Sequence, residues 1–146
     1  MVFGARIAEP VRAPADGVIA TLINTFPDQP IGSVDLQNPA GNQVVLKIGE
    51  GTFIAFGHLQ SGSISVSAGQ SVRRGDIIGL VGNSGNSDEP HLHVQAQDKA
   101  IFDVNKPPGL ITYPLLFDDV QVMRNDRVLP AQPADLRRGD RFSTIG

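Results

Sequence analysis

The sequence predicts an all-β protein built on a single antiparallel β-sheet core with a sandwich-like arrangement. Its 146 residues include 16 glycines and 11 prolines, which separate apolar runs about as long as single strands. No stretch of about ten residues repeats its apolar positions with the 3.6-residue period of an α-helix. We therefore expect many short strands joined by turns, in a chain long enough to bury a hydrophobic core.

The first half of the chain is expected to hold a strand, a long loop and a hairpin. The strand covers 18–24 and follows an Asp-Gly turn. The loop, 25–41, contains three prolines and several Asp and Asn residues. The hairpin joins 42–48 to 52–59 through Gly-Glu-Gly. Long loops in compact domains often border a binding groove, and we expect 25–41 to do so.

Three segments carry turn or strand signals in the second half. Residues 69–76 (Gly-Gln-Ser-Val-Arg-Arg-Gly-Asp) predict a compact turn, because glycine permits tight bends. The apolar run 77–82 predicts a strand. Residues 91–97 predict another strand, which follows a polar, glycine-rich loop.

Composition limits the domain organisation and the classes of partner. Without an internal repeat or low-complexity linker, the chain predicts one domain over 1–146, its core at about 9–97 and C-terminal strands and a tail over 98–146. The net charge of −3, with acidic and basic residues interspersed, argues against a nucleic-acid partner. No apolar run is long enough for a membrane span, and the N-terminus has no signal-peptide pattern.

Two of the three histidines stand two residues apart in the strand 91–97. His91 and His93 therefore share one face, at roughly 6.5–7 Å between Cα atoms, whereas Leu92, Val94 and Ala96 point toward a core. One imidazole on a metal with its neighbour acting as a base suits this geometry. A solvated edge strand is the alternative.

The third histidine, His58, ends the strand 52–59 just before a Ser-Gly turn. Strict alternation places it on the face of Ile54 and Phe56, at the rim of an apolar surface. The three histidines can converge if the two strands are neighbours in one sheet. Because the chain has no cysteine, a transition metal would be held by His and carboxylate groups.

Five segments of the chain together carry a family pattern. In order they are Val11–Gly17 (VRAPADG), Gly57–Leu59 (GHL), Gly69–Gly75 (GQSVRRG), Ile78–Gly85 (IGLVGNSG) and Pro90–Val94 (PHLHV). They resemble the lysostaphin/LytM-type zinc metalloendopeptidases of peptidase family M23. The resemblance implies an antiparallel β-core of the duplicated hybrid motif type, with long loops bordering a groove. It also implies zinc-dependent hydrolysis of peptide cross-links in bacterial peptidoglycan, often at glycyl bonds, in the periplasm, at the cell wall or outside the cell.

The resemblance also implies roles for particular residues. His93 would be a zinc ligand, His91 would lie beside the zinc-bound water, and His58 would be the catalytic partner of His91. The polar loop before His91 would flank a peptidoglycan or glycine-rich peptide substrate. Its predicted substrate-binding residues are Asn83, Ser84, Asn86 and Ser87.

The chain departs from the family at the remaining zinc ligands, which come from a His-x-x-x-Asp motif. It has no histidine before His58, and the ligand aspartate would fall at or before residue 2. A catalytic zinc needs three protein ligands, so the site cannot be assembled in the family's way from His93 alone. The substitutes considered are a three-histidine site or recruitment of a carboxylate such as Glu9.

Three functional hypotheses follow. The first is a peptidoglycan endopeptidase domain that is truncated or incomplete in its zinc site. The second is a catalytically inactive homologue that acts as a cell-wall binding or regulatory module. The third, a biotinyl/lipoyl carrier or phosphotransferase domain, is suggested by the Ala-Pro-Ala-Asp-Gly turn. It fits poorly, because Lys47 lies inside a predicted strand instead of at an exposed hairpin tip.

Overall fold

The computed structural model describes residues 2–4, 6–103, 108–116, 120–124, 127–128 and 141–144. No helix occurs in these segments, so the predicted all-β class is confirmed. By its internal contacts the chain divides into two compact units, Met1–Thr112 and Tyr113–Gly146. The assignment of 1–146 to one domain stays a prediction.

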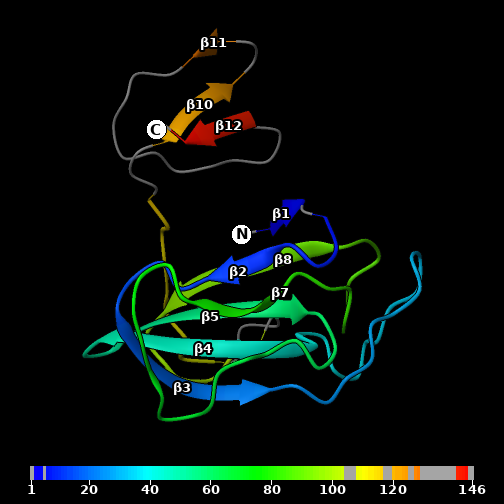
Figure 1. Cartoon of the computed structure of the whole chain (residues 1–146), viewed down its shortest axis with the longest axis horizontal. Helices are drawn as coiled ribbons and strands as arrows, with labels where there is room; N and C mark the ends of the chain where they lie inside the picture. The colour runs from blue at the N-terminus through cyan, green and yellow to red at the C-terminus, as the bar shows by residue number, and fades with distance from the viewer. Residues whose placement is uncertain are drawn as a thin grey trace. The chain divides into compact units, whose positions relative to one another are not determined.

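The first unit is dominated by a seven-stranded antiparallel sheet (Figure 1). Its strands follow the order β1-β8-β5-β4-β3-β6, and β9 pairs with β8 off this path. The two histidine-bearing strands, β5 and β8, are therefore neighbours, as convergence of the histidines requires. The strand bounds are β1 Val2–Gly4, β3 Gly17–Ile23, β4 Asn42–Gly49, β5 Thr52–Leu59, β6 Ser71–Val72, β8 His91–Gln97 and β9 Thr112–Tyr113.

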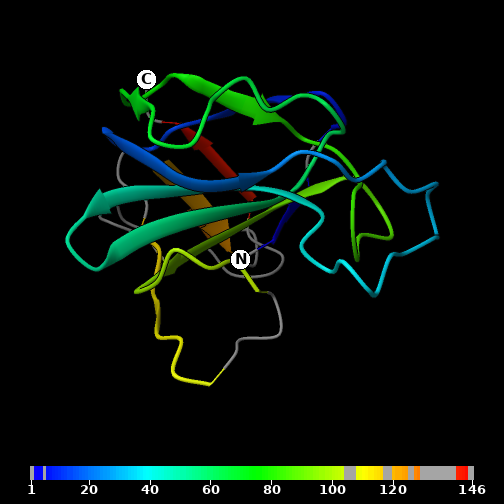
Figure 2. The same cartoon turned by 90° about the horizontal axis from the view of Figure 1, so that it is seen from below.

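A second, two-stranded sheet pairs β2 (Pro10–Arg12) with β7 (Ile77–Leu80) and lies over one face of the large sheet (Figure 2). The core fills the space between the layers. Ile19, Leu46 and Ile78 contribute fully buried side chains to it. Burial of such side chains contributes about 1.5–3 kcal/mol each, which explains the sandwich-like packing that the sequence predicts.

The register fixes which side chains of β8 face the core. Val94 pairs with Phe56 of β5, and Ala96 pairs with Ile54. Val94 and Ala96 are buried, as predicted, whereas Leu92 is half-buried. The opposite face of the large sheet carries His93 next to Gly57 and is the face on which the functional side chains gather.

Two long loops lie side by side at one end of the sheet (Figure 2). Backbone N–H groups of Gln29, Gly32 and Asp35 donate to carbonyl oxygens of the segment 83–88, at 3.0, 2.8 and 2.9 Å. Asp28 reinforces the pair, because its carboxylate accepts the N–H of Asn83 at 2.7 Å. These hydrogen bonds hold the 25–41 loop against the segment 83–88.

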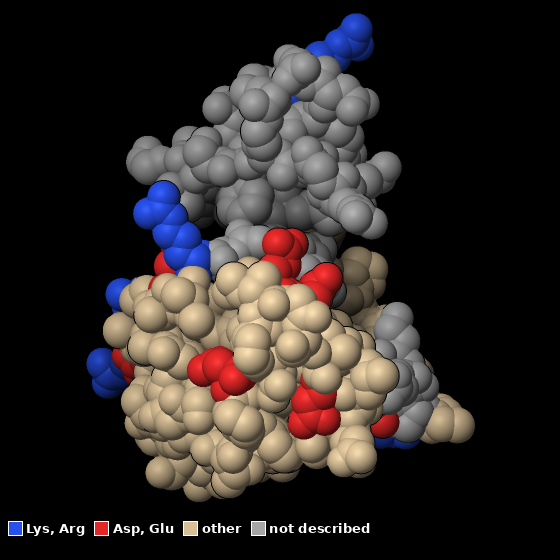
Figure 3. Space-filling model, turned by 90° about the vertical axis from the view of Figure 1, so that its right-hand side faces the viewer, with Lys and Arg blue, Asp and Glu red and all other residues tan. Residues whose placement is uncertain are grey.

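The second unit contributes a three-stranded antiparallel sheet in the order β11-β10-β12, with bounds β10 Val120–Arg124, β11 Arg127–Val128 and β12 Arg141–Thr144. Among the described residues, no helix is long and apolar enough to cross a membrane. On the face of the first unit shown in Figure 3, acidic side chains are scattered among uncharged ones, and basic side chains lie toward its edge.

Candidate active site

A β-bulge in β5 brings the third histidine to the site. The register of β5 against β4 shifts between Val44 and Asn42, so Gly57 and His58 together lie opposite Gln43. His58 has φ of 60°, in the left-handed region that non-glycine residues rarely adopt. Bulges often re-aim a side chain next to an active site, and strained backbone conformations concentrate there.

The bulge overrides the alternation expected from the sequence. Gly57 pairs with His93 and shares its face, so regular pleating would turn His58 with Phe56 into the core. Instead the His58 ring lies with its centroid 4.5 Å from that of His91 and 5.8 Å from that of His93. The three histidines therefore converge, which the sequence allowed on condition that the two strands are neighbours, but their convergence also depends on this irregularity.

Hydrogen bonds fix the tautomers of two imidazoles. The Nδ1 atom of His58 lies 2.9 Å from the carbonyl oxygen of Ser84, and Nδ1 of His91 lies 2.9 Å from that of Glu89. A carbonyl oxygen can only accept, so both Nδ1 atoms carry the proton. Each neutral ring is left with an unprotonated Nε2, which can accept a proton or bind a metal.

A buried relay supports the His91 tautomer. The side-chain amide of Asn83 donates from Nδ2 to the carbonyl oxygen of Gln29 at 2.8 Å, which leaves Oδ1 as an acceptor. That Oδ1 lies 2.7 Å from Ser87 Oγ, and Ser87 Oγ lies 3.1 Å from His91 Nδ1. When the Ser87 hydroxyl donates to Asn83, its oxygen accepts from His91, which reinforces protonation at Nδ1.

Three of the four residues that the sequence predicts to bind substrate lie in the interior of the protein. The side chains of Asn83, Ser84 and Ser87 are only 1%, 0% and 1% exposed. Asn86 is exposed and stays a candidate for substrate contact. Ser84 Oγ accepts the N–H of Asn42 at 2.9 Å and donates to a β5 carbonyl oxygen. The buried three therefore hold the histidines in place instead of lining an open groove.

Burial also keeps the imidazoles of His58 and His93 neutral. His58 is 2% exposed, and burial, followed by the nearby charge of His91, lowers its pKa to about 4. Burial likewise lowers the pKa of His93 to about 4. Both rings are then neutral at pH 7, the state in which an imidazole can act as a base or a ligand.

The described residues do not fit a complete zinc site. Within the part of the chain that the structure describes, no three His, Cys, Asp or Glu residues are grouped so that they could hold a metal ion. The three-histidine and Glu9 substitutes are therefore not formed there. Val2, the last position at which the resemblance places the ligand aspartate, pairs with His93 across β1 and β8.

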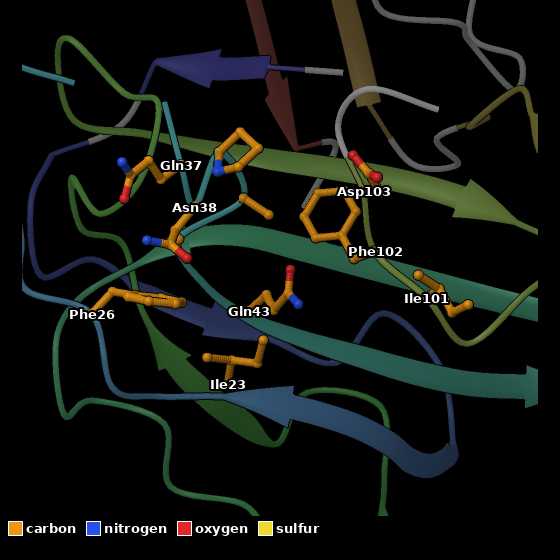
Figure 4. A pocket seen from close by; sticks show the side chains of 11 residues that line it. Ile23, Phe26, Gln37, Asn38, Gln43, Ile101, Phe102 and Asp103 are labelled. Carbon is orange, nitrogen blue, oxygen red and sulfur yellow. The ribbon is translucent and has the colours of Figure 1, made fainter. Parts of the chain in front are cut away.

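Phe102 connects the histidines to a hollow in the surface. Its ring packs edge-on against His93, with centroids 5.2 Å apart and planes at 72°. Gly57 makes this possible, because a Cβ there would lie 2.5 Å from the Phe102 ring. The adjoining hollow, of about 350 Å³, lies between the segments 37–43 and 101–103 (Figure 4). The 25–41 loop borders this hollow, as expected from the sequence, whereas the contribution of Phe102 was not predicted.

Asn42 is another functional residue that the sequence analysis missed. It is fully buried, and its side-chain amide exchanges hydrogen bonds of 2.9 and 2.7 Å with the backbone of Phe26. A third bond, of 3.2 Å, goes to the carbonyl oxygen of Leu59. A Gly-Asn pair before a strand indicates a turn, but it does not indicate that the asparagine side chain links the backbone of Phe26 to that of Leu59.

Replacement of Ser87 by alanine is expected to lower turnover about tenfold while leaving the chain folded, because the His91 ring loses one of its two orienting partners. Long-range ¹H–¹⁵N NMR correlations of the imidazoles report the tautomer directly. Ser87→Ala should increase the share of the His91 Nε2–H form. Ser65→Ala removes an exposed hydroxyl that bonds only to a backbone oxygen, and serves as the control. An unchanged tautomer and an unchanged rate in Ser87→Ala would show that the hydrogen bonds from Asn83 through Ser87 do not orient His91.

The chain is similar to known proteins both in sequence and in fold. The model for Peptidase family M23 matches residues 1–105. DD-carboxypeptidase/endopeptidase Mpg of Neisseria meningitidis serogroup B is 39% identical over 88 residues, which are 60% of this chain and 17% of Mpg. Peptidoglycan DD-endopeptidase ShyA of Vibrio cholerae is 37% identical over 94 residues, 64% of this chain and 18% of ShyA. The chain thus spans less than a fifth of these relatives.

Two solved structures extend the comparison to the fold. The catalytic domain of the antimicrobial peptidase lysostaphin from Staphylococcus simulans aligns with a TM-score of 0.52 and 29% identity, over 70% of this chain and 67% of that domain. A zinc-containing peptidase from Vibrio cholerae aligns with a TM-score of 0.52 and 28% identity, over 65% of this chain and 25% of that protein. Both likenesses agree with the antiparallel β-architecture described above.

Proposed function

Since this chain belongs to peptidase family M23, we propose that it hydrolyses peptide bonds in the cross-links of bacterial peptidoglycan. The observation that carries the proposal is the cluster of three histidines, two of which are held with an open Nε2. The name of ShyA, a peptidoglycan DD-endopeptidase, supports the substrate class. Such a substrate places the chain in the periplasm, at the cell wall or outside the cell.

The roles of the histidines follow from their protonation. His91, with Nδ1–H tied to Glu89, accepts a proton from the attacking water through Nε2. The proton then passes from His91 to the leaving amine as the C–N bond breaks. Neutral His58, whose ring centroid lies 4.5 Å from that of His91, orients the attacking water by accepting a hydrogen bond at Nε2. Neutral imidazoles at pH 7 are the form that this general-base chemistry requires.

His93 is proposed as a metal ligand, and zinc as the metal of the family. The zinc-containing peptidase from Vibrio cholerae supports zinc. Bound zinc in such enzymes lowers the pKa of water and polarises the scissile carbonyl. Because the described residues do not complete a ligand set, the proton-transfer roles above are assigned to the protein's own side chains alone.

The alternative, a catalytically inactive binding or regulatory module, is not favoured. Mpg and ShyA are named as peptidases. A module that only binds peptides also has no chemical need for a strained His58 or for buried imidazoles with fixed tautomers.

The proposal is tested on purified peptidoglycan sacculi incubated with the chain, with and without added zinc. Hydrolysis should release soluble fragments and new amino groups without new reducing sugar ends. A pull-down of the same sacculi separates the two hypotheses. Binding without loss of cross-links would favour the inactive module, and neither binding nor cleavage would overturn the proposed substrate.

A further inference from the structure

The hollow beside Phe102 adjoins the histidine cluster (Figure 4). Phe102 lines the hollow and also packs against His93. Ala40, another lining residue, accepts the backbone N–H of His58 at 2.9 Å. A substrate held in the hollow would therefore extend directly to the proposed catalytic groups.

The chemistry of the lining suits an uncharged chain with amide groups. Ile23, Phe26 and Ile101 supply apolar surface, and Asn38 and Gln43 supply side-chain amides. Asp103 is the charged group of the lining, and neither Lys nor Arg occurs among the described lining residues. A free carboxylate or a phosphate would lack a cationic partner here, whereas peptide groups need none.

Gln43 has an unused hydrogen-bonding atom in this lining. Its Oε1 is buried and has no hydrogen-bond partner among the described residues, whereas the amide of Asn38 donates to Asp35 at 2.9 Å. Gln43 lies opposite the Gly57–His58 bulge, and Figure 4 shows its amide pointing toward Phe102. Buried polar atoms are nearly always paired in folded proteins, so an unpaired acceptor beside a hollow points to a ligand that donates.

We propose that this hollow is a subsite for an uncharged stretch of the peptide substrate, in which Gln43 Oε1 accepts a backbone N–H of that peptide. The inference rests on the proposed function, because it takes the peptide from the same cross-link. It adds a specificity-determining residue that neither the sequence motifs nor the proposed catalytic roles include.

The test measures binding of purified cross-linked stem-peptide dimers by calorimetry in the His91→Ala background, where the ligand is not consumed. Gln43→Leu keeps the side-chain volume but removes the acceptor, and should raise Kd about tenfold, which corresponds to about 1.4 kcal/mol. Gln60→Leu is the matched control. Its Oε1 is also buried without a partner but does not line the hollow, so Kd should stay within about twofold.

In the otherwise unmodified chain, Gln43→Leu should raise KM about tenfold with little change in kcat, since the contact is made before and during reaction alike. Gln43→Met repeats the test with a side chain of different shape, in case leucine distorts β4. Unchanged Kd and KM in both variants, with cleavage retained, would overturn the subsite and leave the proposed function standing. Failure of the unmodified chain to cleave or bind the dimers would overturn both.

Discussion

Replacement of His91 by alanine is expected to abolish cleavage of cross-linked peptidoglycan, with a fall in rate of at least about 10²–10⁴-fold. His91 is the imidazole with its Nδ1–H fixed by Glu89 and Ser87 and its Nε2 open. Alanine removes the only base in this position and leaves His58 without its neighbour. The rate is measured as loss of cross-linked dimers by liquid chromatography.

The fold should survive this change, because the core side chains of β8 lie on the opposite face. The far-ultraviolet circular dichroism spectrum and the unfolding midpoint of His91→Ala should stay close to those of the unmodified chain. Ser65→Ala, which removes an exposed hydroxyl that bonds to the backbone of Ile77, is the control for activity. Undiminished cleavage by folded His91→Ala would show that His91 is not the catalytic base.

Replacement of Asn42 by alanine is expected to lower the free energy of unfolding by about 3 kcal/mol. Three hydrogen bonds of its side chain are lost, and the backbone N–H and carbonyl oxygen of Phe26 lose these partners, whereas the Leu59 oxygen keeps its bond from Ser84 Oγ. Since the backbone N–H of Asn42 also bonds to Ser84, whose carbonyl oxygen holds His58, activity should fall together with stability.

Chemical denaturation, fitted with a common slope for all variants, measures this effect. Asn86→Ala serves as the control for stability, because replacement of an exposed asparagine should change the free energy of unfolding by less than about 0.5 kcal/mol. A loss below about 1 kcal/mol for Asn42→Ala would mean that the 25–41 loop is not anchored through this side chain.

The large features of the fold could be predicted because they rest on periodic patterns. Apolar runs separated by glycine and proline predicted the strands and the hairpin from β4 to β5, and alternation predicted the buried face of Val94 and Ala96. The pairing of β5 with β8, on which the convergence of the histidines depends, could not be predicted. Spacing along the chain does not determine which strands become neighbours.

The site was predictable in its residue types but not in its geometry. His-x-His and Gly-His-Leu marked the three histidines. Alternation, however, placed His58 on the wrong face, because a bulge and a positive φ leave no pattern in one sequence. The polar loop looked like a substrate-binding surface, yet Ser84 and Ser87 are buried and bond inward. A polar side chain needs hydrogen-bond partners, and those of Ser84 and Ser87 lie within the protein.

Incubation of a purified cross-linked stem-peptide dimer with the chain, followed by mass spectrometry of the products, shows whether the chain hydrolyses the cross-link. We expect two monomeric peptides that together gain one water, formed by the unmodified chain and absent with His91→Ala. An intact dimer, in the presence of added zinc and with the chain shown to be folded, would contradict the proposed hydrolysis.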